Sequence, residues 1–200
     1  MKKCLAACAA VAVVALSAVG AAHASVLYTD GPINFNAAAV YYIGPGSEVT
    51  DSFALTGAST VTGVEFGASG ASPSSVDWKV SQGANVYGQG TASASSTYVG
   101  TNQYQYNIYE ATFSIPSITL ASGTYYLTLT NASGVSWEPS TGGPSSACHG
   151  ADCTIFPESF SILGSPAGVP EPSTWAMLIL GVGMIGFRAR RRSQRMRAAA

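Results

Sequence analysis

The side chains with the clearest chemical potential lie in one short stretch, "CHGADC" at residues 148–153. Cys148, His149, Asp152 and Cys153 could together hold a metal ion, or the two cysteines could form a disulfide that closes a small loop. Tetrahedral zinc sites draw their ligands from two separated pairs, and no second pair accompanies this one. The spacing C-x₄-C also differs from the C-x-x-C of redox sites. We therefore predict a Cys148–Cys153 disulfide, formed in an oxidising compartment, and no metal site.

Catalysis has little support in the sequence. His149 is the only histidine after residue 24, so a catalytic site that pairs a nucleophile with a histidine would have to use it. A glycoside hydrolase needs two carboxyl groups at a defined separation. The available acids are scattered, and nothing in the sequence selects a pair from Glu65, Asp77, Glu110, Glu138 and Glu158. We expect no catalytic residue and no enzymatic activity.

Aromatic and amide side chains point instead to carbohydrate binding. Flat rings can cover the apolar face of a sugar, while amides and acids bond its hydroxyl groups. The stretch "YVGTNQYQYN" offers Tyr104 and Tyr106, and "GVSWEPSTGG" offers Trp137 and Glu138 on what reads as a loop. The alternative is that Trp137 and some of these tyrosines fill the core, as we expect of Trp78. These four residues are the candidate ligand-binding site.

The elements that would position these residues are strands. Val76, Trp78 and Val80 alternate with polar residues, and "GTYYLTLTN" and "ESFSILG" repeat this period of two. Short strands separated by Gly, Ser, Asn and Pro predict an all-β antiparallel fold, a two-sheet sandwich of the jelly-roll type. The apolar phase changes between Ile108 and Ala111, which predicts a β-bulge near Ile108–Tyr109.

The acidic balance of residues 25–165 limits the partners of this predicted domain. This stretch has nine acidic side chains and Lys79 as its only base, a formal net charge of −8, whereas the whole chain has −1. Without arginine it has nothing to neutralise phosphates, so nucleic acid is excluded as a partner. We expect no resident cofactor; Ca²⁺ would enter only as a bridge to an anionic polysaccharide.

The first 24 residues have the pattern of a secretory signal peptide. Lys2 and Lys3 precede a long apolar run, and Ala22-His23-Ala24 forms an A-x-A cleavage site before Ser25. We predict an N-terminal signal helix, export through the Sec machinery, and cleavage between Ala24 and Ser25.

The C-terminal residues 170–197 combine three features in a fixed order. Pro170-Glu171-Pro172 follows a linker at 166–169, and residues 175–187 form an apolar run. As a helix this run reaches about 20 Å, shorter than a bilayer core of about 30 Å. An arginine cluster follows, which would stop transfer and keep the C-terminus in the cytoplasm: Arg188, Arg190, Arg191 and Arg192. We predict a short transmembrane helix that holds the chain in the membrane transiently.

This arrangement resembles the PEP-CTERM sorting signal of exopolysaccharide-producing Gram-negative bacteria. The resemblance implies that an exosortase, a membrane transpeptidase, recognises the signal and cuts near Pro170–Pro172. The stretches "VTDSFALTG" to "VDWKVSQG", "SGTYYLTLTNAS" and "FPESFSILG" also resemble the bodies of other proteins with this tail. That second resemblance implies a β-sandwich and carries over no functional residue.

The sequence therefore predicts a protein sorted to the cell envelope, the cell surface or the biofilm matrix, with a structural or adhesive role among extracellular polysaccharides. The alternative is a carbohydrate-binding module of the β-sandwich type. An ice-binding protein and a glycoside hydrolase have less support, because only Thr128 and Thr130 form a threonine pair and no acid pair stands out.

Overall fold

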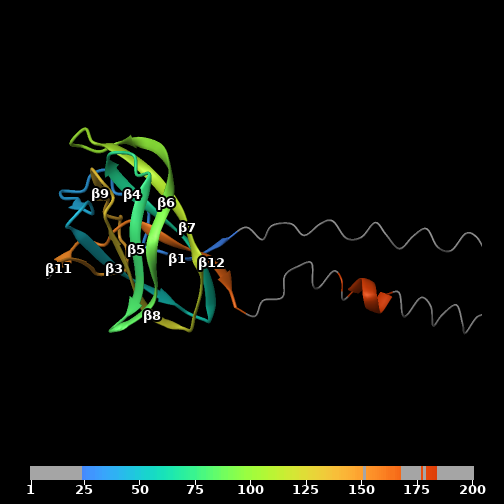
Figure 1. The fold of residues 1–200 in the computed structure, drawn as a ribbon. Coiled ribbons are helices and arrows are strands. Elements are labelled where there is room, and N and C mark those ends of the chain that lie inside the picture. Colours follow the sequence, from blue (N-terminus) through green and yellow to red (C-terminus); the bar gives the residue numbers. More distant parts are fainter. Residues whose placement is uncertain (1–23, 151, 168–176, 178, 184–200) are drawn as a thin grey trace, which may run out of the picture. The chain divides into compact units, whose positions relative to one another are not determined.

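The computed structural model describes residues 24–150, 152–167, 177 and 179–183 (Figure 1). Residues 24–168 form one compact unit, and the remaining residues are grouped apart from it. The predicted signal helix lies outside the described residues, as does most of the predicted transmembrane helix, of which residues 177 and 179–183 are helical. No helix within the described parts of the chain is long and apolar enough to cross a membrane.

The unit at residues 24–168 is built from strands. Its strands are β1 (Ser25–Thr29), β2 (Tyr41–Tyr42), β3 (Glu48–Leu55), β4 (Ser59–Gly70), β5 (Ser75–Gln82), β6 (Asn85–Thr101), β7 (Asn107–Leu120), β8 (Gly123–Thr130), β9 (Val135–Trp137), β10 (Ala147–His149), β11 (Asp152–Ile155) and β12 (Phe160–Pro166). Every strand pair is antiparallel, which confirms the predicted all-β antiparallel class.

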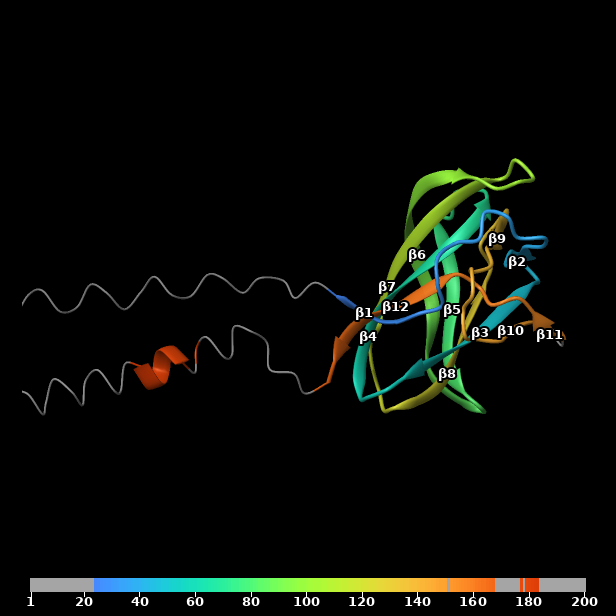
Figure 2. The ribbon, with the colours of Figure 1, turned by 180° about the vertical axis from the view of Figure 1, so that it is seen from behind.

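The strands belong to one continuous, curled sheet. Their order is β1-β12-β4-β7-β6-β5-β8-β3-β10-β11, and the short β9 joins β2 to β4. The long strand β6 pairs with β5 over residues 85–93 and with β7 over residues 94–101, so it links the two halves of the sheet (Figures 1 and 2). The predicted division into two separate sheets is therefore not confirmed, because the hydrogen-bond ladder of β6 runs through both halves.

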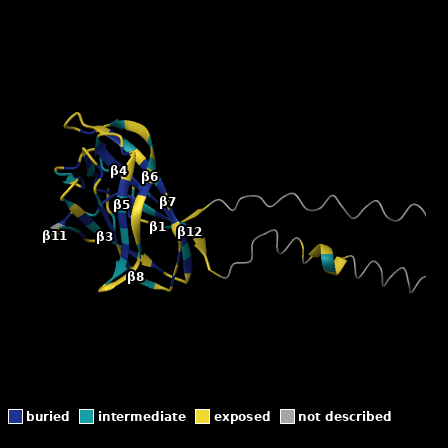
Figure 3. Ribbon diagram, viewed as in Figure 1, coloured by how far each residue is buried: buried dark blue, intermediate teal, exposed yellow. Residues whose placement is uncertain are grey.

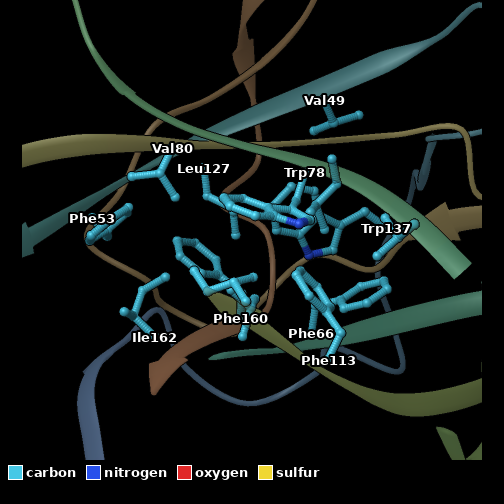
Figure 4. Close-up of a cluster of buried hydrophobic side chains, with 14 of the residues drawn as sticks. Val49, Phe53, Phe66, Trp78, Val80, Phe113, Leu127, Trp137, Phe160 and Ile162 are labelled. Atoms are coloured by element: carbon cyan, nitrogen blue, oxygen red, sulfur yellow. The ribbon is translucent and has the colours of Figure 1, made fainter. Parts of the chain in front are cut away.

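The core lies where the inner faces of the two halves meet. Phe53 of β3 packs against Phe160 of β12 with ring centroids 6.5 Å apart, although these strands lie in different halves. Tyr28 of β1 lies 5.6 Å from Phe160 and 6.1 Å from Phe53. Figure 4 shows Phe53 and Phe160 together with Trp78 and Trp137 in one buried cluster. Figure 3 shows the matching alternation of buried and exposed residues along the strands.

The faces of several strands follow the period-two pattern of the sequence. Val76, Trp78 and Val80 are buried, and so are Tyr125 and the other predicted inward residues of β8 and β12: Leu127, Leu129, Phe160 and Ile162. Thr128 departs from the pattern, because it is also buried and its hydroxyl bonds that of Thr50 at 2.8 Å.

The predicted bulge lies at the expected level of the sheet but on the neighbouring strand. The register between β6 and β7 shifts between Tyr98 and Gly100, opposite Ile108 and Tyr109. The extra residue is therefore Val99 of β6. Near the C-terminal end of the unit, β12 continues through Pro166. The amide of Ala167 donates a hydrogen bond to the carbonyl of Ala58 at 2.7 Å, so the sheet extends into the expected linker.

Replacement of Phe160 by alanine tests how far the closure of the sheet depends on this core. Phe160 is 2% exposed and contacts rings from three other strands. We expect Phe160→Ala to lower the free energy of unfolding by about 3–5 kcal/mol, measured by urea denaturation. Phe156, which is 57% exposed, provides the control, and Phe156→Ala should change stability by less than about 0.5 kcal/mol. Equal effects would contradict a core closed by Phe160.

Candidate functional site

Tyr104 and Tyr106 lie in the turn between β6 and β7, and each is 54% exposed. The side chain of Asn102 builds this turn, because its Oδ1 accepts the amide protons of Tyr104 at 3.0 Å and Tyr106 at 3.1 Å. Gln105 between them has a φ of 65°, the left-handed conformation that such a turn requires. The two predicted aromatic residues are thus presented to solvent by a locally ordered turn.

Trp137 does not belong to this surface, which corrects the prediction. It lies in β9, is fully buried, and donates its indole N–H to the carbonyl of Ser159 at 3.0 Å. Its ring packs against Phe66 at 6.3 Å and Phe160 at 5.6 Å. Because its ring is fully buried and its N–H is already bonded, Trp137 cannot contact a sugar at the surface. The alternation of Val135 and Trp137 around Ser136 was the signal of a short strand, although the flanking residues resemble a loop.

Glu138 is also fully buried, so it cannot contact a ligand at the surface. Its Oε1 accepts a hydrogen bond from Asn102 Nδ2 at 3.3 Å, while its Oε2 has no partner. Asn102 in turn accepts hydrogen bonds from the amides of Tyr104 and Tyr106. Glu138 therefore helps to fix the orientation of the side chain that builds the turn. The structure therefore connects three of the four predicted residues, with Glu138 acting through Asn102 and not on a ligand.

Four carboxyl groups are buried together, a feature that the sequence analysis missed. Asp30, Asp51, Glu138 and Glu158 all have 0% exposure. Asp51 Oδ2 accepts the amide proton of Glu158 at 2.7 Å. Asp51 follows the same period of two as Val49 and Phe53 along β3, and that phase was the available signal.

The buried carboxyl groups differ in how well they are hydrogen-bonded. Asp30 accepts from the Tyr28 hydroxyl at 2.6 Å and from the hydroxyl and amide of Ser145 at 2.5 Å and 3.2 Å. Neither side-chain oxygen of Glu158 has a partner. An ionised carboxylate without partners is very costly to bury, so Glu158 is favoured in its protonated form.

Burial raises the pKa of each of three of these groups. Desolvation raises the pKa of Asp51 from 3.8 to about 7, although hydrogen bonds from Glu158 and Ser145 act in the opposite direction. Desolvation, followed by the nearby charges of Asp51 and Glu138, raises the pKa of Glu158 well above its usual value. Desolvation also raises the pKa of Glu138. Burial thus favours the protonated forms of Asp51, Glu138 and Glu158. Among the residues that the structure describes, no group of three or more His, Cys, Asp or Glu side chains is placed to hold a metal ion.

The "CHGADC" stretch forms the predicted disulfide. The sulfur atoms of Cys148 and Cys153 lie 2.12 Å apart and join β10 to β11. His149 is held by Ser47, whose Oγ lies 2.8 Å from His149 Nε2, and its ring lies 5.7 Å from that of Tyr41. The stretch therefore forms an edge of the sheet, where the disulfide links the last two strands in the strand order.

Two hollows open on the outer faces of the sheet. One, of about 460 Å³, is lined in part by Phe35, Glu65 and Glu110. The other, of about 310 Å³, is lined in part by Asp77 and Lys79. Hydrogen bonds from Thr91 and Asn131 lower the pKa of Asp77, so this acid remains ionised, unlike the buried cluster. The first hollow lies outside the set of residues that the sequence singled out for binding.

The buried carboxyl groups predict an unusual dependence of stability on pH. The pKa values of Asp51, Glu138 and Glu158 are higher in the folded protein than in the unfolded chain, so the folded protein binds more protons at a pH between these values. The free energy of unfolding should therefore be highest below about pH 4. It should fall as the pH rises toward the folded-state pKa, about 7 for Asp51, by about 1.4 kcal/mol per pH unit for each group. Urea denaturation between pH 4 and 8 measures this slope.

The variant Glu158→Gln keeps the shape of the side chain and removes its titration. It should leave stability at pH 4 unchanged and raise it at pH 7, by about 1.4 kcal/mol for each pH unit above the ordinary pKa of a glutamate. Glu48→Gln, at an exposed acid, is the matched control and should change neither value. A stability that rises from pH 4 to pH 8 would contradict the protonated cluster.

The processing sites lie at or beyond the ends of the described unit. Ala24 is exposed, and Ser25 begins β1, where its hydroxyl donates to the carbonyl of Gly164 at 2.9 Å. Cleavage between them would leave β1 complete, and it remains a prediction. The sorting residues Pro170, Glu171 and Pro172 and the arginines 188 and 190–192 lie outside the described residues.

Comparison with known proteins identifies a motif near the end of the chain. Residues 168–192 match the PEP-CTERM protein-sorting motif, which covers the Pro-Glu-Pro sequence and the apolar run. No curated protein sequence matches the chain. The motif makes exosortase the processing partner and directs the chain to the cell envelope or surface of a bacterium. The chain carries a PEP-CTERM sorting motif and is an exosortase-sorted extracellular protein.

Proposed function

We propose that this protein is a structural or adhesive component of the extracellular polysaccharide matrix of a Gram-negative bacterium. The sorting motif supports its delivery to the cell surface. The β-rich unit at residues 24–168 would be the part displayed there. We propose a binding role and not an enzymatic one.

The observation that carries this proposal is the position of the chain ends within the β unit. Ser25 pairs with Gly164, and Pro166 pairs with Ser59 at the start of β4. At the other end of β4, Ser69 pairs with Ile108, next to the turn that holds Tyr104 and Tyr106. Both ends of the unit thus leave from one end of the sheet, and the exposed tyrosines lie at the opposite end (Figure 2). A domain attached through its C-terminus would present these tyrosines to its surroundings.

The alternative function, a carbohydrate-binding module, is favoured by the same tyrosines. Exposed rings fixed by a turn provide flat apolar surface for sugar rings at little cost in side-chain entropy. The formal charge of −8 would repel an acidic polysaccharide, so Ca²⁺ would be needed to bridge the two. A neutral polysaccharide would need no cation.

The two remaining hypotheses fit the geometry less well. An ice-binding surface needs a regular array of exposed threonines, yet Thr128 is only 3% exposed. Glu65 and Glu110, the acids that line the larger hollow, lie side by side, close enough for Glu110 to raise the pKa of Glu65. The two carboxyl groups of a glycoside hydrolase lie about 5 Å or more apart, so that a sugar or a water fits between them.

Retention of the exported chain on the exopolysaccharide of its host tests the proposed function. We expect retention, and we expect the double variant Tyr104→Ser with Tyr106→Ser to reduce it about tenfold, because two stacking surfaces are lost. Tyr126→Ser is the matched control, since Tyr126 is 40% exposed on β8, away from the turn. The measurement is made with and without Ca²⁺. Absence of retention under both conditions would contradict the proposal.

Processing is tested by the intact mass of the chain isolated from its host. We expect a chain that begins at Ser25 and ends close to Pro170–Pro172, because the signal peptidase and the exosortase remove the two ends. Replacement of Glu171 by alanine should reduce processing at the C-terminal end and leave cleavage before Ser25 unchanged. A mature chain that still ends at Ala200 would contradict sorting by an exosortase.

A further inference from the structure

The larger hollow is a groove with a polar floor. Thr29, Ser161 and Glu65 are successive partners across β1, β12 and β4, so their side chains lie in one row on the same face. Ser161 Oγ donates to Thr29 Oγ1 at 3.2 Å. All three residues line the groove of about 460 Å³. The row provides two hydroxyl groups and one carboxyl group to anything that lies in it.

A second carboxyl group, that of Glu110, completes this floor. Glu110 pairs with Gly67, which lies two residues from Glu65 on the same face of β4. A Cβ atom at residue 67 would lie 2.7 Å from Cγ1 of Ile33, so glycine at this position lets Ile33 of the groove lining pack closely against β4. The Glu65 carboxyl group lies beside that of Glu110, and this negatively charged neighbour raises the pKa of Glu65.

The surroundings of Glu65 disfavour its ionised form. Partial burial, and next the charge of Glu110, raise the pKa of Glu65. No basic residue lines the groove to balance the two acids, since Lys79 is the only basic residue of the stretch 25–165 and lines the other hollow. A ligand that brings its own positive charge would offset the repulsion between the two neighbouring carboxylates.

The wall of the groove is apolar. Phe35 is 36% exposed and Val99, the extra residue of the bulge in β6, is 40% exposed. A Cβ atom on Gly100 would lie 3.2 Å from Cε1 of Phe35, so this ring rests against the backbone beside the bulge. An exposed aromatic ring above a row of polar groups suits a sugar, which has an apolar C–H face and polar edges.

We propose that this groove binds a sugar unit that carries an ammonium group, as found in a polysaccharide with free amino sugars. The ammonium group would donate hydrogen bonds to both Glu65 and Glu110, and the sugar ring would lie against Phe35. Thr29 and Ser161 would bond hydroxyl groups of the same unit. This inference rests on the proposed role in a polysaccharide matrix and names the class of glycan.

The charge of the domain agrees with this occupant. A formal charge of −8 attracts a cationic polymer over a long range and repels an acidic one. A neutral sugar would leave the repulsion between the two carboxylates in place and would bring no charged donor, and hydrogen bonds between neutral groups are about half as strong as charge-assisted ones. The groove should therefore discriminate between an amino sugar and its N-acetylated form.

Binding of glucosamine oligomers to the purified exported chain tests the inference. We expect glucosamine oligomers to bind at least about tenfold more tightly than N-acetylglucosamine oligomers of equal length, because two charge-assisted hydrogen bonds depend on the free ammonium group. Calorimetry at low and at physiological salt measures both affinities. Equal affinities, or no binding of either oligomer, would overturn the inference.

Variants separate the groove from attraction by net charge alone. Glu65→Gln with Glu110→Gln should weaken glucosamine binding at least about tenfold. The control, Glu48→Gln with Asp152→Asn, removes the same formal charge at two exposed acids and should leave affinity nearly unchanged. Thermal unfolding confirms that each variant is folded. Equal losses in both double variants would overturn a specific site.

The two proposals fail independently. If the chain is retained on the host exopolysaccharide but does not prefer glucosamine oligomers, the groove assignment is wrong and the matrix role stands. If it binds glucosamine oligomers but not the host polymer, the groove assignment stands and the proposed matrix role is wrong.

Discussion

The fold depends on one strand that takes part in both halves of the sheet. β6 pairs with β5 along its first half and with β7 along its second half, so the sheet curls and its inner faces come together. This curl brings Phe53 within 6.5 Å of Phe160 and closes the aromatic core. Glycine at position 88 of β6 lets the side chains of Ile118 and Trp78 pack against this strand, because a Cβ atom there would lie 2.6 Å from Cδ1 of Ile118 and 3.1 Å from Trp78. The same strand ends in the turn that exposes Tyr104 and Tyr106.

Closure of the core also buries carboxyl groups that have no basic partner. In most proteins a buried carboxylate is paired with a base or bound to a metal. The stretch 25–165 contains only Lys79, and it lines a hollow on the outer face of the sheet. Protons therefore take the place of counter-ions, and hydroxyl groups such as those of Tyr28 and Ser145 satisfy Asp30. Around neutral pH, the stability of the fold should therefore depend on pH more strongly than it would if these carboxyl groups were ionised and in salt bridges.

Local pattern was sufficient to predict the strands but not the site. Trp78 and Tyr125 were placed on the inner face correctly, because the period of two depends only on neighbouring residues. Trp137 and Glu138 were misplaced, because their burial depends on segments far away in the sequence, including Phe160 and Asn102. The Glu65–Glu110 pair could not have been found at all, since it arises from the register of β4 against β7. Cys148 and Cys153 were predictable because their spacing alone brings them together.

The buried cluster also changes what the formal charge means. The value of −8 counts Asp51, Glu138 and Glu158 as ionised, yet burial raises the pKa of all three. The charge that acts on a distant partner is therefore smaller than −8 and comes from the exposed acids, among them Asp77, whose pKa is lowered. Long-range attraction is thus moderate, and recognition of a cationic sugar depends on the short-range geometry of the groove.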